Sequence, residues 1–476
     1  MTDPRSPRAR RPGGRRPRAG ARADAPRLVA YEVLRAVSDE DAYANLLLPA
    51  RIKARGLDAR DAAFATELVA GSLRRQGTYD AIIVACARRP LGRIDAAVLD
   101  ALRLGTHQLL ATRVAAHAAV ATSVDLVRAQ VGQSATGFVN AVLRKVGERS
   151  LDEWVRAVAP DPAGDPIGFA AVARSHPRWV VEELQRALGD RADELDDLLV
   201  ADNTAPRVTL VARPGLSAQD ELLQAAGEGA GGEATPYSPF GVVLTSGDPA
   251  LIPAVGDGRA GVQDEGSQLV ASALAAADVE GRDSTWLDLC AGPGGKATLL
   301  GAIGAGRGAR VLAVERQPHR ADLVVRAARA LPAGTVTVVT GDGTAPAWSP
   351  SIFDRALVDA PCTGLGALRR RPESRWRRSA DDLDGLVALQ VRLLASALDA
   401  VRPGGVVVYS TCSPVLAETA GVVTTVLAGR SDTELADAGA TLHQVPDAAG
   451  PLPGTVQLWP HRHGTDAMFV ALLRRR

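Results

Sequence analysis

Long apolar runs and cysteines are scarce in this chain of 476 residues. No apolar stretch approaches the roughly 20 residues that cross a bilayer, so we expect no membrane span. The four cysteines are too few for a disulfide scaffold and their spacing fits no zinc template, so we expect free thiols and no metal. The first residues are rich in Arg and Pro without an apolar segment, which argues against a secretory signal. These absences predict a cytoplasmic protein with reduced thiols, and we expect a monomer.

Positive charge is unevenly distributed, although the formal net charge is only +1. Residues 1–22 contain eight arginines and one acid among Pro and Gly, so we predict a disordered basic tail over residues 1–26. Such a tail is either simply solvated or a non-specific arm for phosphates. The segment LRRRPESRWRR (368–378) holds six more arginines. We expect these six to line the path of a nucleic-acid backbone, the alternative being a solvated helix face.

The chain divides into a helical part and a later part that mixes strands with helices. Apolar residues recur at helical spacing through residues 27–150, which predicts an all-α domain. The Pro- and Gly-rich APDPAGDPIG (159–168) marks a boundary. We expect a small α+β linking region over residues 170–260, with a helix in HPRWVVEELQRAL, a strand in PRVTLVA and a loop in GEGAGGEATPYSP.

Strands and helices alternate in residues 261–476, which predicts a parallel sheet with helices on both faces. The expected strands are TWLDL, RVLAV, TVTVV, RALVDA and GVVVYS, followed by a last strand in AMFVALLRR. The clearest helix is DDLDGLVALQVRLLASALDAV (381–401), which RPGG closes. We therefore predict a Rossmann-like α/β domain after the helical domain and the linking region.

A glycine-rich turn follows the first of these strands. In DLCAGPGGK (288–296), Gly292, Gly294 and Gly295 let the backbone turn tightly and approach a ligand. Ligands bind such sheets at the carboxyl ends of the strands. The glycine spacing is neither that of a dinucleotide fingerprint nor that of a P-loop, so a dinucleotide or a triphosphate is disfavoured.

Two acids at the next strand ends indicate the cofactor. Glu315 ends the second strand and can accept hydrogen bonds from both ribose hydroxyls of a nucleoside. Asp342, after the third strand, can accept a hydrogen bond from an adenine amino group. Each acid alone is commonly a helix cap, but the ordered pair without a phosphate cradle favours S-adenosylmethionine.

Two cysteines follow the fourth and fifth strands, in LVDAPCTG and VYSTCSP. Both strand ends face the same crevice, so we expect Cys362 and Cys412 to lie close together beside the cofactor. Methylation of C5 in a pyrimidine requires a thiolate that adds to C6 and makes C5 nucleophilic. Asp359 is suited to hydrogen bonding or proton transfer near N3 of that ring. A buried cysteine is usually inert packing, but two cysteines beside one acid fit pyrimidine-C5 chemistry.

These motifs resemble the bacterial 16S ribosomal RNA cytosine-5 methyltransferases of the RsmB/Sun/Fmu type. The matching segments of the later domain are DLCAGPGGK, VDAPCTGLGALRRRPE and YSTCSP with Glu418, supported there by VQDEGSQL and DAMFVALL and in the linking region by HPRW. The helical domain is similar to the NusB-like RNA-binding domain of that family, through RDAAFATELVAGSLRR, LRLGTHQLL, AAHAAV and GFVNAVLRK. The resemblance covers nearly everything after residue 26.

The resemblance implies a reaction and a set of site residues. It implies methyl transfer from S-adenosylmethionine to C5 of a cytosine in 16S rRNA, with Cys412 as nucleophile and Cys362 aiding product release. The implied catalytic residues are Cys412, Cys362 and Asp359. The implied cofactor contacts are Cys290, Ala291, Gly292, Pro293, Gly294, Gly295, Lys296, Glu315, Arg320, Asp342 and Asp359. Thr419 and Ala297 depart from the family's usual Asn and Thr, at positions that do no covalent chemistry.

Three alternatives stay open. A DNA cytosine-5 methyltransferase would use Cys362 of its Pro-Cys motif as nucleophile, but the helical domain and Cys412 argue against it. A different RNA, such as tRNA, is a second possible substrate. A non-catalytic RNA-binding or antitermination factor is disfavoured, because Cys412, Asp359 and the glycines are all retained. No short motif encodes which cytosine is the target.

Overall fold

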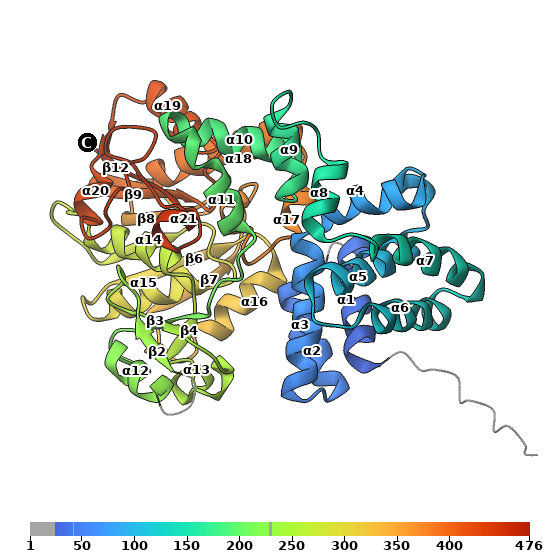
Figure 1. Ribbon diagram of the computed structural model, residues 1–476. Coiled ribbons are helices and arrows are strands. Elements are labelled where there is room, and N and C mark those ends of the chain that lie inside the picture. The colour runs from blue at the N-terminus through green and yellow to red at the C-terminus, as the bar shows by residue number, and fades with distance from the viewer. Residues whose placement is uncertain (1–23, 41, 228–230) are drawn as a thin grey trace, which may run out of the picture. The chain divides into compact units, whose positions relative to one another are not determined.

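The computed structural model describes residues 24–40, 42–227 and 231–476 (Figure 1). Most of the predicted basic tail therefore lies outside the described residues. The chain forms two compact units. The first contains the described residues up to Ala42, 46–72 and 82–154, and the second contains 43–45, 73–81 and 155–476. No helix in these described parts of the chain is long and apolar enough to cross a membrane.

The helices of the first unit agree with the helical spacing of its apolar residues. From residue 24 to 158 the helices are α1 (Ala25–Glu40), α2 (Ala44–Arg55), α3 (Ala59–Arg74), α4 (Gln76–Ala87), α5 (Ala96–Ala111), α6 (Ala116–Gln130), α7 (Gln133–Val146) and α8 (Leu151–Val158). Asp95 caps the N-terminus of α5 by accepting from two backbone N–H groups. Helix α5 contacts α1, α6 and α7, and its side chains, such as Leu102 and Leu104, are fully buried. The core of this unit is therefore built around α5.

A small antiparallel sheet lies in the predicted linking region. It follows α9 (Pro166–Ala173), α10 (Arg178–Leu188) and α11 (Leu195–Asp202). Its strands are β1 (Thr209–Ala212), β2 (Gly232–Ala234), β3 (Gly241–Leu244) and β4 (Ala260–Val262), in the order β2-β3-β1-β4. Two short helices, α12 (Gln219–Gly227) and α13 (Pro253–Gly256), accompany the sheet. The prediction of a loop over GEGAGGEATPYSP is wrong at β2, because this glycine-containing segment pairs with β3 through backbone hydrogen bonds that need no apolar pattern.

The large sheet has the mainly parallel topology predicted from the alternation of strands and helices. Its order is β10-β12-β9-β8-β5-β6-β7, with β11 paired to β12. Strands β9, β8, β5, β6 and β7 run parallel, whereas β12 is antiparallel to both of its neighbours in the order. Their bounds are β5 (Thr285–Asp288), β6 (Arg310–Glu315), β7 (Val336–Thr340), β8 (Phe353–Asp359), β9 (Val401–Thr411), β10 (Thr433–Ala436), β11 (Val456–Gln457) and β12 (Phe469–Arg475). Strand order reverses between β5 and β8, where ligands bind in such sheets.

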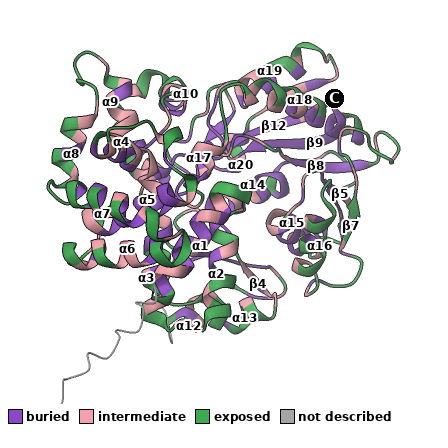
Figure 2. Cartoon of the chain, turned by 90° about the vertical axis from the view of Figure 1, so that its right-hand side faces the viewer, coloured by how far each residue is buried: buried purple, intermediate pink, exposed green. Residues whose placement is uncertain are grey.

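Helices cover both faces of the large sheet, and its central strands are buried between them, whereas the edge strand β7 is largely exposed (Figure 2). Alternate residues of β9 enter different cores: Val408 packs in the core that contains α14 and α15, and Val407 in the core that contains α18 and α19. These helices are α14 (Glu265–Ala276), α15 (Gly295–Ala305), α18 (Asp382–Ala400) and α19 (Ala420–Ala428). The predicted helix 381–401 is confirmed within one residue at each end. RPGG lies inside β9 rather than in a separate turn, and β10 and β11 were not predicted.

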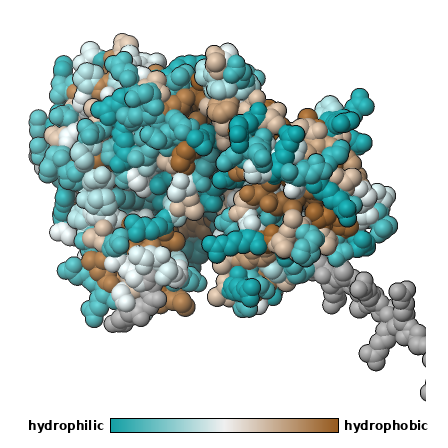
Figure 3. All heavy atoms as spheres, in the orientation of Figure 1, coloured by the Kyte–Doolittle hydropathy of each residue, from teal (hydrophilic) through white to brown (hydrophobic). Residues whose placement is uncertain are grey.

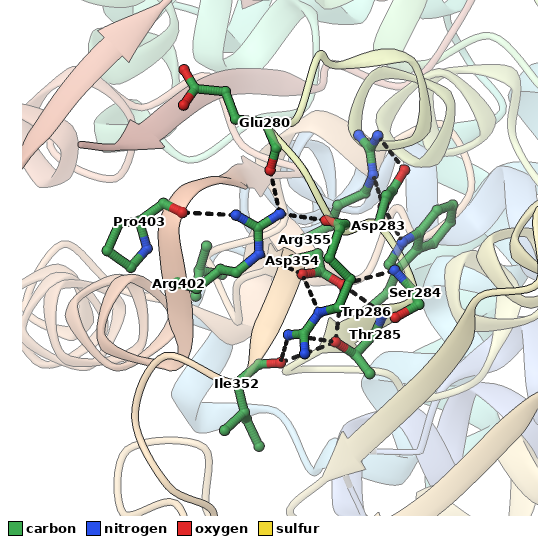
Figure 4. Close-up of polar contacts among 12 residues, drawn as sticks. Glu280, Asp283, Ser284, Thr285, Trp286, Ile352, Asp354, Arg355, Arg402 and Pro403 are labelled. Carbon is green, nitrogen blue, oxygen red and sulfur yellow. Dashed lines mark hydrogen bonds and ion pairs between the residues drawn. The ribbon is translucent and has the colours of Figure 1, made fainter.

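A polar network closes the amino-terminal end of the large sheet (Figure 4). The Asp354 carboxylate, near the start of β8, is fully buried. It accepts hydrogen bonds from the backbone N–H groups of Ser284 and Thr285 at 2.7 and 2.8 Å, and from Arg282 and Arg402 at 3.0 and 2.7 Å. Burial alone would raise the pKa of Asp354, but these donors outweigh it and lower the pKa to about 2. The network fixes the entry into β5 at the end of the sheet opposite the candidate site.

Replacing Asp354 with Asn should cost about 2 kcal/mol of unfolding free energy at pH 7, because the folded pKa is about 2 and the unfolded value is 3.8. The folded pKa is the lower one, so this contribution is present above the unfolded pKa and is lost as pH falls through the folded pKa. Urea denaturation of the wild type and of Asp354→Asn at pH 7 and pH 3 measures this contribution. The difference in unfolding free energy between the two proteins should be roughly halved at pH 3. Equal stability of the two chains at pH 7 would contradict this assignment.

Candidate active site

The carboxyl ends of the parallel strands meet at one edge of the large sheet. Asp359 at the end of β8 pairs with Ser410 near the end of β9. Glu315 at the end of β6 pairs with Thr340 at the end of β7. Asp288 ends β5, which lies between β6 and β8. The residues predicted from the sequence therefore follow neighbouring strand ends along this edge.

The glycine turn after β5 contains the predicted contacts from Cys290 to Lys296. A Cβ atom on Gly292 would lie 2.2 Å from a carboxylate oxygen of Glu315, so any larger residue there would displace that carboxylate. The Gly292 N–H donates to Glu315 Oε2 at 3.1 Å. Gly294 has a φ of +113° and caps the N-terminus of α15, which again favours glycine. The turn is therefore held tightly against the acid that ends the second strand.

Glu315 is a buried carboxylate with acceptor capacity to spare. Its Oε1 accepts the Gln317 N–H at 2.9 Å, and its Oε2 accepts that of Gly292. A carboxylate can accept about four hydrogen bonds, so further donors can bind here. Arg320 of α16 (Pro318–Ala327) donates to the Gly292 carbonyl at 2.5 Å, and its guanidinium lies 3.7 Å from Glu315. Arg320 thus braces the glycine turn from the side of α16.

Asp342 lies after β7, one strand farther along the edge, and is exposed. Its Oδ1 accepts hydrogen bonds from the hydroxyl and the N–H of Thr344 at 2.7 and 2.9 Å. These two hydrogen bonds lower the pKa of Asp342. The carboxylate is therefore ionised at neutral pH, with Oδ2 on the side of Arg316, 3.9 Å away.

Two buried polar side chains near the turn carry atoms without a hydrogen-bond partner in the described residues. Asp288 accepts the Cys290 N–H at 3.3 Å through Oδ1, but its Oδ2 has no partner. The side-chain amide of Gln263, which lies beside Gly295, also has no partner for either atom. Two causes raise the pKa of Asp288 to about 7: burial, which is the larger, and the negative charge of Asp359. A hydrogen-bonding ligand would satisfy such atoms, so the turn fits a nucleoside cofactor.

The two cysteines after β8 and β9 are in contact, as predicted: Cys362 Sγ and Cys412 Sγ lie 3.5 Å apart. The hydrogen bond from Cys362 lowers the pKa of Cys412, and the cations Lys296 and Arg371 act in the same direction. The same hydrogen bond, together with burial, raises the pKa of Cys362 well above its ordinary value. The pair therefore favours a Cys412 thiolate that accepts a hydrogen bond from a Cys362 thiol.

Lys296 connects the glycine turn with the cysteines. Its Nζ lies 2.7 Å from Asp359 Oδ2 and 3.3 Å from the Ser267 hydroxyl. Burial disfavours the charged ammonium, but the Asp359 carboxylate outweighs burial and raises the pKa of Lys296. The sequence predicted Lys296 as a cofactor contact; its ion pair with Asp359 was not predicted.

A buried carboxylate, Glu418, joins the two loops that carry the cysteines. It accepts the Thr363 N–H at 2.8 Å through Oε1 and the Thr363 hydroxyl at 2.5 Å through Oε2. The Thr363 hydroxyl in turn lies 3.0 Å from that of Ser413, and Gln390 also donates to Glu418, at 3.0 Å. Thr363 and Ser413 each directly follow a cysteine. In the sequence, Glu418 was singled out only through the family resemblance. Its hydrogen bonds to Thr363, which contacts Ser413, show that it holds the two cysteine-bearing loops together.

Comparison with known proteins identifies the family. Residues 275–474 match the family model described as 16S rRNA methyltransferase RsmB/F, and residues 24–148 match that of the NusB family. The ribosomal RNA small subunit methyltransferase B of Xanthomonas campestris is 32% identical over 94% of this chain and 97% of its own length. The chain belongs to the RsmB/F family. It is therefore an rRNA methyltransferase with S-adenosylmethionine as its cofactor.

Other known proteins match this RsmB/F chain over nearly its whole length. A Mycobacterium tuberculosis protein with the provisional name of a methyltransferase is 52% identical over 99% of both chains. The solved structure titled PH0851 covers 94% of this chain and 99% of its own, with a TM-score of 0.80 and 22% identity. At that identity the likeness supports the fold alone, and it confirms the Rossmann-like α/β prediction.

The arginines after Cys362 do not form one exposed strip in this RsmB/F chain. Arg369 and Arg370 bind two buried carboxylates, Arg369 to Asp466 at 3.1 Å and Arg370 to Asp264 at 2.5 Å. Arg375 is fully buried and donates to a backbone carbonyl and to an asparagine side chain, both at 2.9 Å. The expectation that all six line a nucleic-acid path is therefore wrong for these three. The other three, which are exposed or partly exposed, are Arg371, Arg377 and Arg378.

Replacing Glu418 with Gln should slow methyl transfer by up to about 10²-fold, because an amide offers Thr363 one good acceptor instead of two and loosens the contact between the cysteines. The pH profile should shift upward, since Cys412 loses part of the hydrogen bond that lowers its pKa. Single-turnover methylation of 16S rRNA across pH, with cofactor affinity measured by calorimetry, tests both effects. Glu434→Gln, at a solvent-exposed ion pair, is the matched control. An unchanged pH profile in Glu418→Gln would refute the positioning role.

Proposed function

We propose that this rRNA methyltransferase transfers a methyl group to C5 of a cytosine in 16S rRNA, through a covalent bond between Cys412 Sγ and C6. The observation that carries the proposal is the contact between Cys362 and Cys412 beside the Lys296–Asp359 ion pair. C5 of cytosine is not nucleophilic until a group adds to C6. A thiolate beside an acid is suited to that addition.

Cys412 is the nucleophile in this proposal. Its thiol loses its proton more readily than an ordinary cysteine, because Cys362 donates a hydrogen bond that lowers its pKa. Attack on C6 places negative charge on the ring near N3. Asp359 is the group we assign to hydrogen bonding and proton transfer at that position, and the Lys296 ammonium that donates to it can supply the proton. S-adenosylmethionine supplies the electrophilic methyl group when bound.

Cys362 takes part in product release. After methyl transfer, the C5 proton must leave so that the C6–sulfur bond can break and aromaticity returns. Cys362 is in contact with Cys412 and keeps its own proton because its pKa is raised. After methyl transfer Cys412 is bonded to C6 and no longer carries the charge that raises the pKa of Cys362. Cys362 can then release its own proton to solvent and accept the C5 proton, while the C6–sulfur bond breaks and Cys412 leaves as a thiolate.

In this proposal the residues at the strand ends from β5 to β7 would hold the cofactor. Glu315 would accept hydrogen bonds from the ribose hydroxyls, Asp342 would accept one from the adenine amino group, and the turn from Cys290 to Lys296 would hold the methionine part. The spare acceptor capacity of Glu315 and the orphaned atoms of Asp288 and Gln263 support this assignment. Arg320 acts indirectly, by holding the Gly292 carbonyl.

Several further expectations remain part of the proposal. Residues 27–150 are proposed to bind RNA, and residues 261–476 to carry the chemistry on an extruded base, with 170–260 between them. We expect action in the cytoplasm, as a monomer. Bisulfite sequencing of 16S rRNA from a deletion strain, with and without the restored gene, identifies the cytosine. Loss of a tRNA cytosine mark instead would redirect the proposal to tRNA.

The roles of the two cysteines can be separated with single variants. Cys412→Ala should form no covalent adduct and lose essentially all turnover. Cys362→Ala should still attack and methylate, then stall before elimination, so a protein–RNA complex that survives denaturing gels should accumulate. Cys86→Ala, at a buried cysteine of the helical unit, is the control. A wild-type adduct that maps to Cys362 would reverse the assignment and favour a DNA-type mechanism.

Replacing Glu315 with Ala should weaken S-adenosylmethionine binding about ten- to a hundredfold, which corresponds to roughly 1.5–3 kcal/mol for a charge-assisted hydrogen bond. Isothermal calorimetry measures the affinity of each variant for S-adenosylmethionine directly. Glu315→Gln keeps one acceptor for the Gly292 N–H, and so separates loss of the ribose contact from loosening of the turn. Unchanged affinity in Glu315→Ala would rule out the ribose assignment.

A further inference from the structure

Exposed cations gather where α4 and α7 end in the helical unit. We call these residues the basic patch: Arg88, Arg89, Arg93, Arg144 and Lys145. Lys145 Nζ donates to the Cys86 carbonyl in the last turn of α4 at 3.2 Å. The Arg89 guanidinium lies 4.8 Å from the centre of the Phe138 ring of α7. These two contacts bring the connection after α4 and the helix α7 side by side, and hydrophilic side chains project at the outer end of α4 in Figure 3.

The cations of the basic patch have no acidic partners, in contrast to other arginines of the same unit. Arg55 pairs with Glu32, and Arg128 pairs with Asp125. None of the five patch residues forms an ion pair within the parts of the chain that the structure describes. Asp95, the acid nearest to Arg93 in sequence, is occupied as the cap of α5. The patch therefore keeps its positive charge uncompensated.

Helix C-termini favour cations, which offers a structural reason for some of this charge. Lys145 fulfils that role at α4 through its contact with a carbonyl of the last turn. Arg93 has no such role, because it lies in a short 3-10 helix (Leu91–Arg93) beyond α4. Buried Ile94 and the Asp95 cap anchor that segment, so its arginines extend from a fixed backbone. A fixed, uncompensated set of guanidinium groups is suited to an extended anion.

We propose that the basic patch binds the sugar–phosphate backbone of the substrate RNA, outside the target nucleotide. The proposal rests on the proposed function, since it takes RNA as the partner. Arginine binds phosphate oxygens with two parallel hydrogen bonds, and the ring of Phe138 helps to hold the Arg89 guanidinium in place over its face. Binding of this kind is detected by measuring how the affinity for RNA depends on salt concentration, because each bound phosphate releases condensed counterions.

The test compares two triple variants of the full chain on a labelled 16S rRNA fragment. Arg88→Ala/Arg89→Ala/Arg93→Ala removes the free cations, and Arg51→Ala/Arg55→Ala/Arg128→Ala removes arginines that lie near acids. The first should weaken RNA binding and flatten the slope of log affinity against log salt by about 0.7–0.9 for each phosphate that the variant no longer binds. The second should leave the slope near that of the wild type. Methyl transfer at saturating RNA should be unchanged in the second variant, and the first should need a higher RNA concentration for half-maximal methyl transfer.

Thermal melting first establishes that each variant is folded, and Arg93→Glu alone provides a milder second variant with an effect in the same direction. A salt slope equal to that of the wild type in the folded triple variant and in Arg93→Glu would overturn the proposal, as would equal slopes for both triple variants. The slope could be flattened in the variant while the wild-type enzyme methylates no cytosine of 16S rRNA. That pair of results would support the basic patch and refute the cytosine-5 assignment. The two failures are therefore distinguishable.

Discussion

The buried hydrogen bonds of Glu418 are the interaction on which the geometry of this site depends. Two parallel strands end side by side, but nothing in a sheet fixes the turns that follow their last residues. Glu418 removes that freedom by binding the residue after Cys362, whose hydroxyl contacts the residue after Cys412. With the turns fixed, the thiols can share one proton, and the state of each cysteine follows from its neighbour rather than from solvent.

The two ends of the large sheet differ in how completely their buried polar groups are hydrogen-bonded. At the amino-terminal end, Asp354 receives donors from backbone and arginine side chains, and the end is held firmly closed. At the carboxyl end, Asp288 and Gln263 keep polar atoms that have no partners among the described residues, and the ion pair of Lys296 and Asp359 lies next to two thiols. Parallel strands make this separation possible, because all their carboxyl ends lie on one side.

The sequence was most informative where chemistry follows directly after a strand. The apolar strands predicted the sheet, and the acids and cysteines after them predicted which side chains would meet, as the contact of Cys362 with Cys412 confirms. Long-range pairing was not predictable. The partners of Arg370 lie 106 and 96 residues away in the chain, so its burial in an ion cluster leaves no local signal. Likewise, β2 forms through backbone pairing in a glycine-containing segment that lacks an apolar alternation.

The unpartnered atoms of Asp288 and Gln263 have a thermodynamic consequence. Burying a polar group without a hydrogen bond costs free energy, so hydrogen bonds from a bound cofactor to these atoms would be favourable. A ligand that supplies those hydrogen bonds binds the folded chain and not the unfolded one, and it raises the melting temperature with its concentration. Folding and cofactor binding are therefore thermodynamically linked, and the unfolding free energy of this enzyme rises with the concentration of the methyl donor.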